Sequence, residues 1–212
     1  MNILVTRPEH DDTTYYLSHW SKKILDFAKK KGEKIFDLNR ERATKKEVTS
    51  FLSKKNPEFV IFNGHGDDDL VSGHKNETLI KAGENEGLLK NKMIYAISCK
   101  SAKKLGPESI NAGAVSYIGY DDDFVFIYEK NKITNPLTDD IAKIYLEPSN
   151  ELIISLIKGN STNESYKRSQ DMFMANLRKL LTSEAPSTPA VRYLWWDIKH
   201  QVLLGDKEAA LS

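Results

Sequence analysis

The chain has 212 residues, of which 40% are hydrophobic and 29% are charged, and both fractions are typical of a globular domain with a substantial core. Its 31 Lys and Arg residues against 30 Asp and Glu residues give a net charge of +1, which leaves no overall field to hold nucleic acid or an anionic membrane. The single cysteine excludes an internal disulfide and a cysteine-rich zinc site. At about 150 residues per domain, one large domain is expected.

The N-terminal apolar run at residues 3–5 is too short for a secretory signal and follows no basic stretch, so it predicts a buried strand. No window approaches the ~18 consecutive apolar residues that a membrane-spanning helix requires. A lone thiol without an export signal favours a reducing, cytoplasmic environment.

Short apolar runs then alternate with amphipathic stretches, a pattern typical of βα units on a parallel sheet. Strands are predicted at residues 35–38, 59–62, 93–97 and 114–120. Helices are predicted at residues 17–31, from residue 44 to 55 behind a capping-box spacing, and at residues 100–105. Residues 71–87 are expected to be an irregular excursion, and the apolar stretch at residues 124–128 either extends the sheet or forms an edge hairpin.

The apolar period changes to a helical one between residues 137 and 181, and an aromatic-rich segment containing Trp195 and Trp196 follows. We therefore predict one domain, with a sheet core over residues 1–135 and a helical C-terminal part over residues 136–212. The aromatic cluster favours packing of the C-terminal element onto the core over stacking against a base or sugar.

Polar residues follow three of the predicted strands. His65 comes after the strand at 59–62, Cys99 after the strand at 93–97, and Asp121, Asp122 and Asp123 after the strand at 114–120. Ligands of open parallel sheets bind at the carboxyl ends of the strands, so these residues are expected at one edge.

A cysteine acts as a nucleophile only when a neighbour helps to form the thiolate, because a free thiol with a pKa near ~8.5 is mostly protonated at neutral pH. His65 is the expected partner. The helix predicted after Cys99 is expected to lower the thiol pKa further and to offer backbone N–H groups to an oxyanion. Gly66 lets the backbone approach a substrate carbonyl without a Cβ in the way.

An apolar strand before His65-Gly66, followed by an apolar strand before Ser98-Cys99, resembles the pattern of the caspase-like cysteine peptidases, which include caspases, gingipains, separase and the CHAT domains. The CHAT and gingipain-like branch is the most similar. Further likeness lies in residues 97–102, in residues 113–119 and in residues 203–206. The resemblance implies a three-layer α/β/α fold with a mainly parallel central sheet, here with a helical C-terminal elaboration.

The same resemblance implies that Cys99 attacks a peptide carbonyl, that His65 protonates the leaving amine, and that the N–H groups of Gly66 and Cys99 stabilise the oxyanion, with no metal or organic cofactor. The loop with Asp121, Asp122 and Asp123 would line the pocket for the residue before the scissile bond. Carboxylates there predict cleavage of a protein or peptide substrate after Arg or Lys. Small chains of this kind also resemble effectors that a regulatory partner or ligand activates.

Other polar residues have plainer interpretations. His10 is interpreted as a surface loop residue, and zinc binding by His65 with His74 is not expected without further Cys or His nearby. The run Asp67, Asp68 and Asp69, like residues 121–123, offers oxygen ligands for calcium but lacks the EF-hand pattern.

Two alternatives stay open. One is a catalytically silent interaction or ligand-sensing module on the same scaffold. The other is a flavodoxin-like nucleotide-binding domain, which is disfavoured because Thr6-Arg7-Pro8 stands where a glycine-rich phosphate loop would follow the first strand.

Overall fold

Six strands form the central sheet, in the spatial order β2-β1-β3-β7-β8-β9, in a computed structural model that describes residues 1–182 and 188–211. The first five strands pair in parallel, and β9 runs antiparallel to β8 at the edge. Their bounds are β1 Asn2–Arg7, β2 Lys34–Asn39, β3 Phe59–Asn63, β7 Met93–Ile97, β8 Ser116–Tyr120 and β9 Gln201–Gly205.

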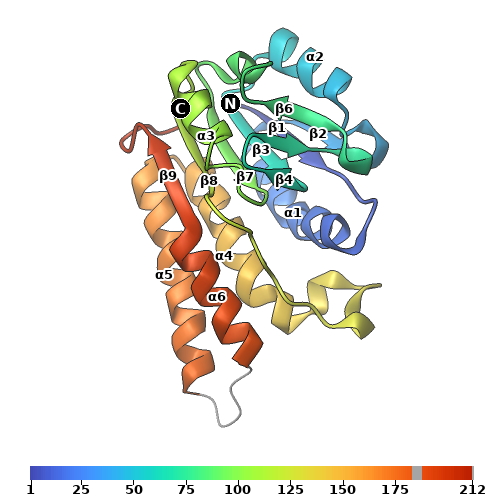
Figure 1. Ribbon diagram of the computed structural model, residues 1–212, viewed down its shortest axis with the longest axis vertical. Coiled ribbons are helices and arrows are strands. Elements are labelled where there is room, and N and C mark those ends of the chain that lie inside the picture. Colours follow the sequence, from blue (N-terminus) through green and yellow to red (C-terminus); the bar gives the residue numbers. More distant parts are fainter. Residues whose placement is uncertain (183–187, 212) are drawn as a thin grey trace.

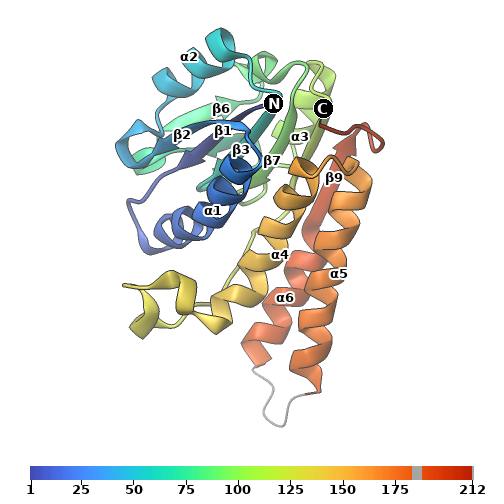
Figure 2. The same cartoon turned by 180° about the vertical axis from the view of Figure 1, so that it is seen from behind.

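Helices cover both faces of this sheet (Figure 1; Figure 2). One face carries α1 Asp12–Lys30 and the C-terminal helices α4 Asp140–Ile157, α5 Thr162–Leu181 and α6 Thr188–His200, whereas the other carries α2 Lys45–Lys55 and α3 Leu105–Asn111. The predicted three-layer α/β/α architecture with a mainly parallel sheet is confirmed.

Successive side chains along the strands point alternately into two hydrophobic cores, one on each face of the sheet. Ile3 and Val5 of β1 face the core beneath α1 and α4, while Leu4 between them faces the core beneath α2. Strands buried on both faces give continuous apolar runs, which is why they were predictable from sequence. No helix among residues 1–182 and 188–211 is long and apolar enough to cross a membrane.

Four expectations need correction. Residues 100–104 form turns, and α3 begins at Leu105, where the predicted helix was to end. Residues 66–81 contain a small antiparallel sheet of β4 Gly66–Asp67, β5 Leu70–Ser72 and β6 Thr78–Lys81. The stretch 124–128 is extended but belongs to no strand. Strand β9 completes the central sheet, so the part after residue 135 is not wholly helical.

Short 3-10 helices occupy Arg40–Arg42, His74–Asn76, Glu86–Leu89, Lys130–Lys132 and Pro136–Thr138.

Candidate active site

His65 and Cys99 follow two neighbouring strands, β3 and β7, and lie at the same edge of the sheet. Strands β3 and β7 pair in parallel with Asn63 opposite Ile97, so the loops after them leave the sheet side by side. A Cβ placed on Gly66 would lie 2.2 Å from the Ser98 hydroxyl oxygen and 2.7 Å from the Cys99 carbonyl oxygen. The His65 loop therefore packs directly on the Cys99 loop, and only glycine permits this approach.

The small antiparallel sheet holds the His65 loop in place. Both the backbone N–H and the hydroxyl of Ser72 in β5 donate to the His65 carbonyl, at 2.9 and 3.0 Å. Gly64 has a φ of +154°, and a Cβ there would lie 2.4 Å from the Ser72 carbonyl oxygen. The segment expected to be an irregular excursion thus supports the candidate catalytic histidine.

The His65 imidazole is hydrogen-bonded to Asp11, a residue that sequence reasoning did not assign to the site. Nε2 of His65 lies 2.6 Å from Oδ2 of Asp11. The other carboxylate oxygen of Asp11 caps α1 by accepting the Thr14 N–H at 2.8 Å. Partial burial opposes ionisation of Asp11, but the hydrogen bonds from Thr14 and His65 outweigh it and leave the Asp11 pKa below its ordinary value.

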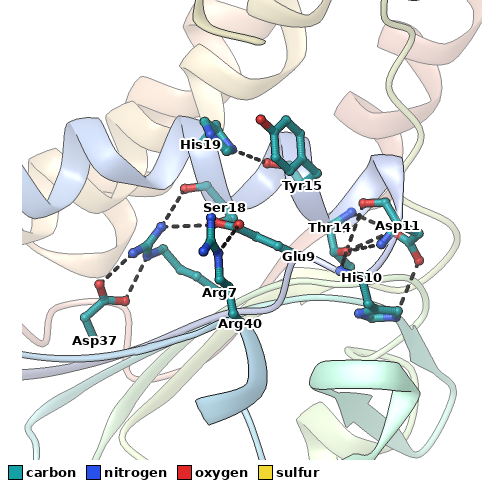
Figure 3. Close-up of polar contacts among 10 residues, drawn as sticks. All are labelled: Arg7, Glu9, His10, Asp11, Thr14, Tyr15, Ser18, His19, Asp37 and Arg40. Atoms are coloured by element: carbon teal, nitrogen blue, oxygen red, sulfur yellow. Dashed lines mark hydrogen bonds and ion pairs between the residues drawn. The ribbon is translucent and has the colours of Figure 1, made fainter. Parts of the chain in front are cut away.

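Further polar contacts join the end of β1 to β2 and α1 (Figure 3). The buried Arg7 guanidinium donates to both oxygens of Asp37, at 2.8 and 2.6 Å, and to the Ser18 hydroxyl at 2.8 Å. Ser18 in turn donates to Glu9 at 2.7 Å. Bidentate pairing of this kind is rigid, so the network fixes the end of β1 from which Asp11 follows.

His10 is not simply a surface loop residue, because its ring lies against His65. The two ring centroids are 5.9 Å apart, and the centroid of His74 is 5.7 Å from that of His10. His10, Asp11 and His65 each offer a ligand atom, and these atoms lie within 4.8 Å of one another, so this group could hold a metal ion. His74, which was not expected to bind zinc together with His65, does not belong to that group.

Cys99 lies half-buried at the end of β7, and its thiol is covered. Sγ donates to the Phe124 carbonyl oxygen at 3.7 Å. Burial raises the pKa of the thiol to about 11, with Asp123 and Asp197 adding to the effect and the Phe124 contact and Lys100 opposing it. The expected helix N-terminus beside Cys99 does not exist, because turns follow and Lys100 has a φ of 56°. The thiol is therefore neutral in this conformation.

His65 and Cys99 are neighbours without a direct hydrogen bond within residues 1–182 and 188–211. The backbone of residues 98–102 is joined instead to the end of β8, since Lys100 N–H donates to the Asp122 carbonyl and Ala102 N–H to that of Tyr120, both at 2.9 Å.

Acidic residues near the site have cationic partners. The side chain of Asp121 pairs with His200 at 2.7 Å, and that of Asp123 pairs with Lys100 at 3.5 Å. Among the acids of residues 67–69, Asp68 pairs with Lys103 at 2.9 Å.

An open hollow of about 350 Å³ lies beside the histidine. Its lining residues are His65, Gly66, Asp67, Leu70, Ser72, Asn76 and Thr78. A second hollow of about 310 Å³ is lined by Asp11 and by residues that include His10, Asp12 and Tyr15. His65 is thus reachable from solvent through the first hollow, whereas the Cys99 thiol contacts the Phe124 carbonyl and lines neither hollow.

Comparison with solved structures assigns the fold. Gingipain R, an Arg-specific cysteine proteinase, superposes with a TM-score of 0.66 over 99% of this chain and 47% of its own, at 11% identity. A complex of the pro- and mature domains of RgpB from Porphyromonas gingivalis gives a TM-score of 0.64 over 100% of this chain and 48% of that one, also at 11% identity. The chain has the fold of the caspase-like cysteine peptidases.

The predicted resemblance to caspase-like peptidases is confirmed at the level of the fold. No family model matches the sequence, and no curated protein matches it. The chain spans about half the length of the gingipain structures. The likeness to CHAT domains stays a prediction.

Proposed function

We propose that this caspase-like protein is a cysteine endopeptidase in which Cys99 is the nucleophile, His65 the general base and acid, and Asp11 the residue that orients His65. The observation that carries the proposal is the 2.6 Å hydrogen bond between His65 and an ionised Asp11, formed at the sheet edge where the Gly66 backbone packs on Cys99. A carboxylate bonded to one imidazole nitrogen fixes the tautomer and stabilises the imidazolium.

The reaction proceeds through an acyl-enzyme. His65 takes the proton of the Cys99 thiol, and the thiolate sulfur attacks the peptide carbonyl carbon, with the oxyanion accepting hydrogen bonds from the N–H groups of Gly66 and Cys99. The C–N bond then breaks as His65 gives its proton to the leaving amine. Water, deprotonated by His65, attacks the thioester carbonyl, and the thiol leaves with the proton that returns from His65.

This proposal includes a closed resting state. We define the strap as residues 121–128, the segment whose Phe124 carbonyl accepts the hydrogen bond from the Cys99 thiol. A buried, neutral thiol without a bond to His65 does not attack a carbonyl, so the strap has to move before catalysis. A regulatory protein partner, a ligand or the substrate itself would supply that movement by binding the open form more tightly.

The proposed substrate is a protein or peptide with Arg or Lys before the scissile bond. The strap follows β8 beside the Cys99 loop and carries Asp121, Asp122 and Asp123, which the proposal places at the rim of the substrate pocket. Asp121 and Asp123 have cationic partners in the closed state, and their carboxylates would attract a basic substrate residue to this rim once the strap moves. The alternative is a catalytically silent module that uses the same edge to bind a partner.

A peptide probe with an electrophilic acyloxymethyl ketone after arginine tests the proposal. Intact-mass analysis is expected to show one adduct, on Cys99, in the wild-type protein and little in His65→Ala. A probe with aspartate in place of arginine should react much more slowly. Absence of any adduct with arginine, lysine or leucine probes would support the silent module instead.

A further inference from the structure

Asp197 is a fully buried carboxyl group, and only one of its two oxygens has a hydrogen-bond partner among the described residues. It lies in α6, four residues before β9, and its exposed fraction is 0%. Oδ1 accepts the Val125 N–H at 2.9 Å, while Oδ2 has no hydrogen-bond partner within the part of the chain that the structure describes. Burying a carboxyl oxygen without a partner is costly, so native proteins rarely leave one in this state.

One peptide unit of the strap closes over both Asp197 and Cys99. The carbonyl of Phe124 meets the thiol at 3.7 Å, and the N–H of the next residue, Val125, meets Asp197 at 2.9 Å. Since these two groups share a single peptide unit, the sulfur and the carboxylate are at most roughly 9 Å apart. The neighbouring Trp196 side chain donates to the Asp123 carbonyl at 3.0 Å, which adds a second bond between α6 and the strap.

The surroundings of Asp197 contain hydroxyls rather than a cation. Tyr95, Tyr120 and Tyr145 are buried nearby, and no ion pair to Asp197 exists among residues 1–182 and 188–211. Burial raises the pKa of Asp197 well above its ordinary value, while the bond from Val125 opposes the rise. In the closed state burial therefore favours the neutral form of the carboxyl group, which lacks a positive partner among the described residues.

We propose that Asp197 is the floor of a pocket that opens when the strap lifts, and that its carboxylate binds the guanidinium or ammonium group of the substrate residue before the scissile bond. This inference rests on the proposed peptidase function and names the side chain that would select the substrate. An extended arginine places its guanidinium roughly 6–7 Å from its Cα, which fits a carboxylate at this distance from the attacking sulfur. Asp121, Asp122 and Asp123 then form the rim and do not bind the cation directly.

Charge and geometry explain why a basic side chain fits. When the strap leaves, both oxygens of Asp197 become free to accept the paired N–H groups of a guanidinium, a bidentate arrangement among the strongest in proteins. The substrate cation also supplies the missing positive partner, so Asp197 ionises as the substrate binds. Binding of a basic residue and opening of the strap are thus coupled through one carboxyl group.

The first experiment compares arginine with citrulline, which has the same shape without the charge. Acyloxymethyl ketone probes carrying arginine, citrulline or leucine are reacted with the full chain, and rate constants for Cys99 labelling are measured by intact mass. The wild-type arginine-to-citrulline ratio is expected to fall by roughly 10- to 100-fold in Asp197→Asn. The matched control Asp171→Asn, an exposed acid on α5, should leave the ratio unchanged. An unchanged ratio in Asp197→Asn, or an equal fall in Asp122→Asn alone, would overturn the inference.

A second variant excludes a merely structural effect. Asp197→Glu keeps the charge but lengthens the side chain by one methylene, which leaves less room for a guanidinium than for an ammonium group. The preference is expected to move from arginine toward lysine. Equal loss of labelling by every probe, together with a lowered melting temperature, would assign Asp197 to folding and contradict the inference.

A binding measurement separates this inference from the proposed function. In Cys99→Ala, which cannot hydrolyse a peptide, calorimetry should show that a peptide ending in arginine binds roughly tenfold or more tightly than the same peptide ending in citrulline, and Asp197→Asn should abolish the difference. A binding difference without labelling of Cys99 in the wild-type protein would overturn the peptidase proposal while Asp197 remains the cation site. Labelling of Cys99 without a binding difference between the two peptides would overturn the assignment of Asp197 as the cation site.

Discussion

Asp11, the N-cap of α1, and His65, in the loop after β3, are joined by a hydrogen bond of 2.6 Å. The same carboxylate caps α1 through its other oxygen, which accepts the Thr14 N–H. Helix capping and histidine orientation therefore depend on one side chain. They can be separated by substitution, because asparagine caps helices about as well as aspartate but carries no charge.

Replacing Asp11 by asparagine is expected to lower kcat roughly 100-fold or more while changing the free energy of unfolding little, because the cap is kept and the imidazolium loses its counter-ion. Asp11→Ala should lose the same activity and about 1 kcal/mol of stability as well. Asp26→Asn, at an exposed position of the same helix, is the matched control. Peptide hydrolysis and urea unfolding measure the two effects. Full activity of Asp11→Asn would remove Asp11 from the mechanism.

Cys99→Ala is expected to abolish hydrolysis and leave the protein folded. The substitution removes the nucleophile and leaves only a small space beside Phe124, so the stability loss should be about 1 kcal/mol or less. Lys103→Ala, a nearby exposed position, serves as the control. Circular dichroism checks the fold. Hydrolysis by Cys99→Ala at the wild-type rate would end the peptidase assignment.

Three neighbouring histidines allow a comparison within one cluster. His65→Ala is expected to reduce hydrolysis nearly as much as Cys99→Ala does, since effects within a catalytic unit are not additive. His74→Ala should retain most activity, because His74 contacts the ring of His10 and does not join the group of His10, Asp11 and His65. Initial rates of hydrolysis of one arginine peptide are compared for His65→Ala, His74→Ala and Cys99→Ala. Were His65→Ala to keep full activity, the base would have to be His10 instead.

The pH dependence of alkylation reports on the closed state. With the Cys99 pKa raised to about 11, the rate with iodoacetamide should rise about tenfold per pH unit from pH 7 to 10 without levelling. In the unfolded chain the same rate should level above about pH 8.5. The fold favours the neutral thiol, so this group's contribution to stability is present below the unfolded-state pKa and declines as the pH rises toward 11. A plateau below pH 8 in the folded protein would contradict a shielded thiol.

Chelators are expected to leave hydrolysis unchanged, because the proposed chemistry uses no metal. Excess zinc should inhibit it, because imidazole and carboxylate groups of His10, Asp11 and His65 lie within 4.8 Å and a bound cation would prevent His65 from accepting a proton. His10→Ala should weaken the inhibition, whereas His74→Ala should not. Activity that is lost with chelator and restored by zinc would show instead that the reaction requires the metal.

The sequence by itself determined the alternation of strands and helices and the positions of His65 and Cys99 at strand ends. Those features depend on local patterns: runs such as residues 59–62 are apolar throughout because both faces of the strand are buried, and the glycine after His65 marks a close approach. The fold class followed from the same alternation. The helix expected after Cys99 was wrong because tertiary hydrogen bonds to the end of β8 hold residues 100–104 in turns.

Only the tertiary structure decided which side chains meet. Asp11 is separated from His65 by more than fifty residues, and Asp197 approaches Cys99 because β9 returns antiparallel to β8 and brings α6 against the strap. Periodicity reports which face of an element is buried but not which element covers it. Contacts between distant segments depend on strand order and helix packing, and these physical relationships have no local signature in the chain.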